Sequence, residues 1–122
     1  GVILPAMHYG RDGILAVAMT LQLMAERQKS LADMAAAIPA YHMEKRKVPA
    51  EGADLQGLYA RLHRRFPEAE TDDRDGLRLA WEKSWLHVRP SNTEPIVRAI
   101  AEAPSREASV ALCEAVSAAL NA

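Results

Sequence analysis

The sequence has only one cysteine, Cys113, so it cannot form a disulfide within the chain. A lone thiol is typical of proteins that work in a reducing cytoplasm. Charged residues interrupt the apolar runs well short of the ~20 residues that span a bilayer. Residues 1–5 also lack the basic start of a secretory signal peptide. We therefore expect a cytoplasmic protein with no membrane segment.

An excess of charge of one sign is also missing. The 122 residues carry 15 Lys and Arg against 16 Asp and Glu, a formal net charge of -1. No global field therefore favours nucleic acid or an acidic membrane surface as a partner. Apolar residues (49%) and charged residues (25%) have the balance of an ordinary globular protein. The length allows one domain of roughly 80–100 residues with a further segment attached.

Residues 1–39 contain predicted apolar elements with few packing partners in the chain. The apolar run at residues 2–4 predicts a buried strand, and residues 12–28 predict a helix that is apolar on most sides. Such a helix needs neighbours on most sides, and the chain offers few. Ser30 begins a capping box for a short second helix that stops before Pro39. Together with the missing initiator Met, this pattern predicts a fragment of a longer protein.

Residues 40–122 carry a regular alternation of strand and helix patterns, and we place a domain boundary at their start. The turn dipeptide Asp75-Gly76 separates a polar run from a half-buried strand. The predicted strands are 43–48, 77–81, 85–89 and 96–103, and the predicted helices are 55–66 and the segment after Ser105. This order predicts an α+β sandwich: an antiparallel four-stranded sheet with two helices on one face.

The segment best suited to chemistry is the connection Arg89-Pro90-Ser91-Asn92-Thr93-Glu94-Pro95 between two of these strands. Its two prolines stiffen the loop, and its hydroxyls, amide and backbone N–H groups can surround an anion. Arg89 and Arg98 lie at the strand ends, and guanidinium groups match phosphate oxygens in a bidentate way. The loop therefore favours a phosphate group. Solvated turns use the same residue types, so the chemistry alone leaves this open.

Residues 89–98 resemble the phosphate-binding loop of the α-D-phosphohexomutase superfamily, which includes phosphomannomutase, phosphoglucomutase and phosphoglucosamine mutase. Residues 1–13 are similar to the segment that follows the sugar-recognition loop in the third domain of these enzymes. The resemblance implies that residues 1–39 end domain three and that residues 40–122 form domain four. It also implies that the substrate's phosphate is bound by Arg89, Ser91, Asn92, Thr93 and Arg98.

The resemblance further implies a parent enzyme that interconverts sugar 1-phosphates and 6-phosphates through a phosphoserine and a bisphosphate intermediate. That enzyme would need Mg²⁺ and a hexose bisphosphate activator. The phosphoserine and the metal-binding Asp triplet belong to earlier domains, so we expect no catalytic residue, metal site or cofactor here. We interpret residues 72–75 as a solvated hairpin. The expected partners are a phosphosugar and the upstream domains of the same parent chain, not nucleic acid or a membrane.

Two questions stay open at this point. A free-standing phosphate-binding or interaction module without activity is the alternative to an enzyme fragment, and the sugar is not identified. His87 is expected on the same side of its strand as Arg89, where it would either line the phosphate site or have no part in it. The basic residues 45–47 would either add charge to that site or lie on a solvated strand edge.

Overall fold

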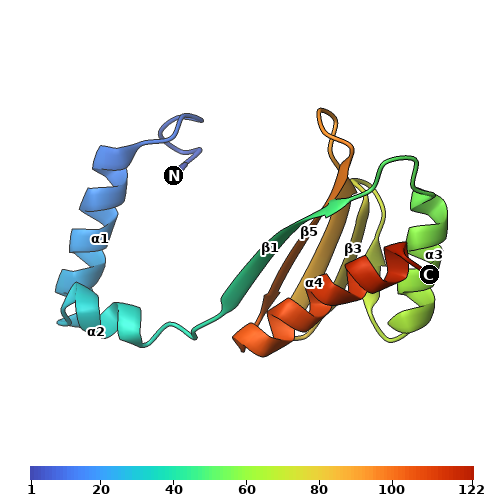
Figure 1. The fold of residues 1–122 in the computed structure, drawn as a ribbon. Coiled ribbons are helices and arrows are strands. Elements are labelled where there is room, and N and C mark those ends of the chain that lie inside the picture. Colours follow the sequence, from blue (N-terminus) through green and yellow to red (C-terminus); the bar gives the residue numbers. More distant parts are fainter. The chain divides into compact units, whose positions relative to one another are not determined.

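The computed structural model describes residues 1–122 as two compact units, Gly1–Pro39 and Ala40–Ala122. Figure 1 shows the elements of both units along the chain. The first unit contains α1 (Gly13–Arg27) and α2 (Leu31–Ala36). None of the helices in the chain is long and apolar enough to cross a bilayer.

Both helices of the first unit begin at side chains that the sequence provides for this purpose. The Asp12 carboxylate accepts the N–H of Leu15 at 2.9 Å, and the Ser30 hydroxyl accepts the N–H of Asp33 at 3.1 Å. These bonds satisfy N–H groups that have no partner within the helix. Helix α1 ends at Gln28 in the left-handed conformation (φ 51°). The two helices predicted for this unit are confirmed.

The strand predicted at residues 2–4 is wrong. Leu4 makes only an isolated bridge to His8, and Ile3 is 49% exposed. A strand is stabilised by a neighbouring strand, and residues 1–39 provide none. The apolar face of α1 is likewise uncovered: Ile14 is 85% exposed and Val17 60%. The helix expected to be surrounded buries no residue within this unit.

The second unit is an antiparallel sheet with two helices, which confirms the α+β class. Its sheet has five strands in the order β1-β5-β4-β3-β2, not the predicted four. The strands are β1 (His42–Pro49), β2 (Glu70–Asp72), β3 (Leu77–Trp81), β4 (Ser84–Pro90) and β5 (Ile96–Ala103), and the helices are α3 (Leu55–Arg65) and α4 (Arg106–Leu120). The missed strand is β2, whose three polar residues carry no apolar alternation. It exists because the turn at residues 73–76 folds it back onto β3.

Both helices cover the same face of the sheet. Leu58 and Leu62 of α3 and Val116 of α4 join one buried cluster with alternate residues of the central strands. These strand residues, all at most 1% exposed, are Leu77, Leu79, Leu86, Val88, Val97, Ala99 and Ala101. Because side chains alternate along a strand, the intervening residues point to the other face. Helix α3 contacts α4, and α4 lies on β1, β5 and β4.

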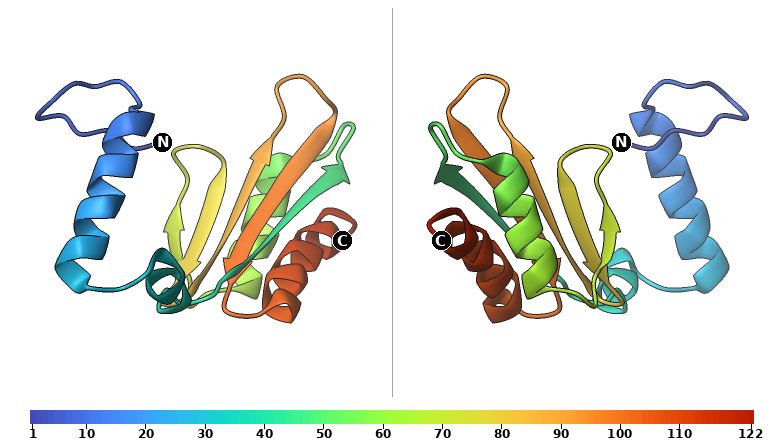
Figure 2. Two further views of the ribbon diagram at one scale, coloured as in Figure 1. Left: turned by 90° about the vertical axis from the view of Figure 1, so that its left-hand side faces the viewer. Right: turned by 90° about the vertical axis from the view of Figure 1, so that its right-hand side faces the viewer.

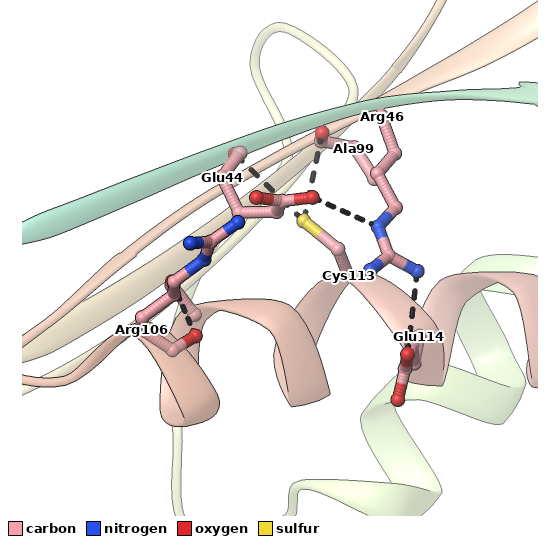
Figure 3. A network of polar contacts seen from close by, with 7 residues as sticks. Glu44, Arg46, Ala99, Arg106, Cys113 and Glu114 are labelled. Atoms are coloured by element: carbon pink, nitrogen blue, oxygen red, sulfur yellow. Dashed lines mark hydrogen bonds and ion pairs between the residues drawn. The ribbon is translucent and has the colours of Figure 1, made fainter.

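A polar network joins the edge strand β1 to α4 (Figure 3). Arg46 donates to Glu44 at 3.0 Å and to Glu114 at 3.4 Å. The Cys113 Sγ lies 3.8 Å from the backbone oxygen of Glu44 and 3.7 Å from that of Ala99, the two acceptors within reach of its single S–H donor. Glu44 and Arg46 therefore lie on the helix-covered side of β1, and the edge strand is fixed by charge as well as by apolar packing.

The connection between β4 and β5 projects beyond the end of the sheet, as the orange loop in Figures 1 and 2 shows. It comprises residues 91–95 and contains no helix or strand. The backbone N–H of Ala50, just after β1, donates to the carbonyl of Pro95 at 3.0 Å. The loop is thus held at its base by the segment that leads into α3.

Candidate functional site

Strand register brings the two arginines of the loop to the same place. Arg89 of β4 lies directly opposite Arg98 of β5 in the antiparallel ladder. Directly paired residues on neighbouring strands point to the same face, with Cβ atoms about 4.5–5.5 Å apart. Their sequence neighbours Val88 and Val97 point into the core, so both arginines lie on the face without helices. The two guanidinium groups therefore project from neighbouring positions at the loop end of the sheet.

A concavity of about 210 Å³ opens where this end of the sheet meets the loop. It is lined by Arg89, Pro90, Ser91, Asn92, Thr93 and Arg98. All five residues predicted for the site are in this set, and the sixth is one of the two stiffening prolines. Arginine, hydroxyl and amide groups thus share one small hollow with no acidic side chain in its lining.

The loop backbone leaves donors available in the same region. The N–H of Ser91 donates to the carbonyl of Ile96 (3.0 Å), and the N–H of Ile96 donates to the carbonyl of Glu94 (2.8 Å). The N–H of Thr93 makes a long bond to the Ser91 hydroxyl at 3.4 Å. The N–H groups of Asn92 and Glu94 donate to no acceptor in the chain. Free amides in a turn between fixed strands are suited to an anion.

Both arginines have carboxylate neighbours, but neither guanidinium uses all of its N–H donors. Arg89 donates to Asp75 at 3.1 Å. Arg98 makes a 3.4 Å bond to the Ser91 hydroxyl and lies 3.7 Å from Glu94. A guanidinium has five N–H donors, so several remain free on each arginine. These pairs are partly exposed to solvent, where an ion pair contributes little, and an incoming dianion can compete with the carboxylates.

The turn between β2 and β3 supplies Asp75. Its neighbour Gly76 has φ 80°, a conformation that only glycine adopts without strain. A Cβ at Gly76 would collide with the carbonyl of Val88 and approach Arg89 within 3.0 Å. The turn therefore packs closely against β4 at the arginine. This contact places the Asp75 carboxylate on the guanidinium of Arg89.

His87 lies on the same face as Arg89, as the alternation predicts, but it does not line the concavity. Its Nε2 donates to the backbone carbonyl of Asp75 at 2.6 Å. The basic run at residues 45–47 divides between the two faces. Arg46 takes part in the network on the helix side, whereas Lys47 lies opposite Arg98 on the open face. Lys47 donates to both carboxylate oxygens of Glu94 at 3.0 Å.

Sequence reasoning missed the parts that Asp75, Glu94 and Lys47 take around the arginines. Glu94 was part of the loop motif but not one of the predicted site residues, and Asp75 entered only as a turn residue. The contact of Asp75 with Arg89 and the contact of Lys47 with Glu94 both depend on which strands pair and in which register. A pairing of strand 42–49 with strand 96–103 would have revealed Lys47, because it fixes Lys47 opposite Arg98.

Two acidic residues of the β2–β3 hairpin, Asp72 and Asp75, pair with arginines. Arg74 donates to Asp72 through Nε at 2.9 Å, and this hydrogen bond holds the pKa of the Asp72 carboxyl far below its usual range. Asp75 faces Arg89 instead. No three His, Cys, Asp or Glu side chains of the chain are grouped closely enough to hold a metal ion.

Fold and loop together define an α+β sandwich domain with an arginine-flanked hollow at the loop end of its sheet. Residues 22–119 match the family model described as phosphoglucomutase/phosphomannomutase, C-terminal domain. Residues 1–41 match the phosphoglucomutase/phosphomannomutase alpha/beta/alpha domain III. The chain belongs to the phosphoglucomutase/phosphomannomutase family, within the phosphohexomutase superfamily that the loop motif indicated.

Curated relatives agree with this assignment. The chain is 32% identical over 109 residues to a phosphoglucomutase/phosphomannomutase of Thermococcus kodakarensis, covering 88% of the chain and 24% of the relative. It is 33% identical to a probable phosphoglucosamine mutase of Methanopyrus kandleri, covering 84% and 23%. It is 31% identical to a phosphoglucosamine/phosphogalactosamine mutase of Sulfurisphaera tokodaii, again covering 84% and 23%. The chain thus spans about a quarter of the length of these relatives.

Proposed function

We propose that this chain is the C-terminal part of a phosphohexose mutase and that its loop binds the substrate's non-reacting phosphate. The binding residues are Arg89, Ser91, Asn92, Thr93 and Arg98. The observation that carries the proposal is their arrangement around one concavity, with both guanidinium groups on the same side of the sheet. In this division of the chain, residues 1–39 end domain three and residues 40–122 are domain four. Family membership supports both parts of the proposal.

The arrangement has a clear physical use. A phosphate dianion would accept hydrogen bonds from two guanidinium forks, two hydroxyls and the free amides of Asn92 and Glu94. Because the loop is fixed at its base and contains two prolines, little conformational freedom is lost on binding. Binding energy gained at this phosphate, remote from the chemistry, orients the other end of the sugar for reaction.

The parent reaction in this proposal moves a phosphoryl group between the 1 and 6 positions of a sugar through a phosphoserine and a bisphosphate. In this proposal the chain binds one phosphate and contributes no group that transfers the other. Mg²⁺ and a hexose bisphosphate activator belong to the parent enzyme. In this proposal Mg²⁺ is held by an earlier domain of the parent enzyme. The single buried Cys113 is consistent with a reducing cytoplasm.

The names of the relatives indicate the substrate class. One is named for glucose and mannose phosphates, and two for hexosamine phosphates. A hexose or hexosamine phosphate is therefore the proposed substrate. The uncovered apolar residues of α1, such as Ile14, favour a chain that packs against further domains over a free-standing module.

A coupled assay of the full-length parent with mannose, glucose and glucosamine 1-phosphates tests the proposal. Turnover of at least one of them is expected. The double variant Arg89→Ala/Arg98→Ala should lower kcat/KM by about 10²-fold or more, because two charge-assisted contacts are lost. Absence of turnover with all three sugars, or full activity of the double variant, would contradict the proposal.

A further inference from the structure

Three cations stand in a row across neighbouring strands at the loop end of the sheet. Lys47 of β1 pairs with Arg98 of β5, and Arg98 pairs with Arg89 of β4. Like charges directly opposite one another destabilise a sheet. Such a row persists where carboxylates offset it or where an anionic ligand uses it. Arg89 and Arg98 line the concavity, but Lys47 does not.

The loop also contains a carboxylate that works against an anion site. Glu94 follows Thr93 directly, and its Oε2 lies 3.7 Å from Nη2 of Arg98. A small movement would bring it into full hydrogen-bond contact with Arg98. From there it would occupy guanidinium donors and repel an incoming phosphate. The site therefore needs something that keeps this carboxylate occupied elsewhere.

Lys47 is placed to do so. Its ammonium group lies 3.0 Å from both carboxylate oxygens of Glu94, closer than Arg98 and in contact with both oxygens. Arg98 instead reaches the Ser91 hydroxyl at 3.4 Å, in the lining of the concavity. The Glu94 carboxylate thus contacts Lys47, which lies outside the concavity, more closely than it contacts Arg98, which lines it.

We propose that Lys47 is a positioning residue for the phosphate site, which neutralises Glu94 and keeps its carboxylate off Arg98. The inference rests on the proposed function, since it assumes that Arg98 binds phosphate. Lys47 acts through Glu94 and does not itself touch the ligand. Loss of Lys47 then harms binding only as long as Glu94 carries its charge.

A double-mutant cycle on the 122-residue chain tests this, with affinities for inorganic phosphate and for glucosamine 6-phosphate measured by NMR titration. Lys47→Met should weaken binding about three- to fivefold, the scale of one exposed ion pair. Glu94→Gln should bind at least as tightly as the native chain. Lys47→Met/Glu94→Gln should regain the affinity of Glu94→Gln. The matched control is Lys45→Met, which removes a charge from the same face of β1 opposite Ile100 and should leave affinity unchanged.

The outcomes separate the two proposals. Equal weakening by Lys47→Met with and without Glu94 would show direct contact with the ligand and overturn the inference. An unchanged affinity in Lys47→Met would also overturn the inference. So would a loss of affinity in Lys45→Met as large as that in Lys47→Met. If Arg98→Ala weakens binding while Lys47→Met does not, only the inference falls. If Arg98→Ala binds as tightly as the native chain, the proposed function falls with it. Thermal unfolding of each variant checks that it is folded.

Discussion

Arg89 can be removed without removing anything that holds the sheet together. Its side chain is 42% exposed and that of its partner Asp75 is 69% exposed, so the pair contributes little to stability. Arg89→Ala should weaken phosphate binding by about 1.5–3 kcal/mol, or roughly 10- to 150-fold, the value of a charge-assisted hydrogen bond. The thermal unfolding midpoint should stay nearly unchanged.

Phosphate titration and a thermal melt of the same variant check both halves of this prediction. Arg64→Ala is the matched control, because it removes an exposed arginine from α3, away from the concavity. A large loss of stability in Arg89→Ala, or equal affinity losses in both variants, would contradict the role given to Arg89.

Cys113 is the opposite case, a reactive residue type made inert by its surroundings. It is fully buried, and burial, with a smaller effect of the Glu44 charge, raises the pKa of its thiol from 9.0 to about 11. The folded chain at pH 8 should therefore react with a disulfide reagent at least ~100-fold more slowly than the chain in denaturing urea. Similar rates in both conditions would show that the thiol is accessible.

The raised pKa of Cys113 also has a consequence for stability. The unfolded chain loses this proton near pH 9 and the folded chain near pH 11. The contribution of the neutral thiol is therefore complete below pH 9 and declines as the pH rises from 9 towards 11. Burial also raises the pKa of Tyr59 above 10.0, so urea unfolding over this range should show a decline that is smaller, not absent, in Cys113→Ala.

The residues that line the concavity could be predicted to lie together because they are close in the sequence. Arg89 to Thr93 are consecutive, and Arg98 enters because a short loop returns the next strand beside the first. Their carboxylate partners could not be predicted in the same way. Asp75 reaches Arg89 from the turn between β2 and β3, and Lys47 reaches Glu94 from 47 residues earlier in the chain. Only the strand register brings these pairs together.

Among the elements, the β2–β3 turn has the sharpest requirement. Gly76 combines a positive φ with close contact to the backbone of β4, whereas Gly52 has φ 67° and open space around it. Gly76→Ala should therefore lower the free energy of unfolding by about 1–3 kcal/mol, and by more than Gly52→Ala, which carries the conformational strain alone.

Urea unfolding measures both glycine variants, and the amide shift of Arg89 reports whether the turn has moved. Because the turn positions Asp75, Gly76→Ala should also shift the Arg89 resonance, and Gly52→Ala should not. Equal losses of stability in the two variants would mean that the contact with the Val88 carbonyl is unimportant.

Elements with strong periodicity were predicted closely, and those that depend on a partner were not. Strands 77–81 and 96–103 and the helix after Ser105 match the structure because apolar alternation or a capping residue marks each one. β2 carries no such mark and forms only by pairing with β3. The apolar run at residues 2–4 carries the mark of a strand but finds no neighbour. A local apolar pattern therefore predicts a strand only where the fold also supplies a neighbouring strand to pair with it.

At the scale of the whole chain, stability is concentrated in one unit. All fully buried apolar side chains lie at Val48 or later, and residues 1–39 bury none. Residues 40–122 alone should therefore unfold cooperatively in urea, with nearly the midpoint of the 122-residue chain. A peptide of residues 1–39 should show little helix by circular dichroism, since helices of this length need packing to persist. A loss of cooperativity in residues 40–122 would place essential core contacts in the first unit.

The central claim is that a fixed loop between two arginines receives a phosphate group. Its most direct test is a ¹H–¹⁵N NMR titration of the 122-residue chain with glucosamine 6-phosphate and with inorganic phosphate. We predict saturable shifts confined to residues 89–98, largest at the free amides of Asn92 and Glu94, with both ligands. Saturable shifts elsewhere in the chain, with residues 89–98 unmoved, would contradict it.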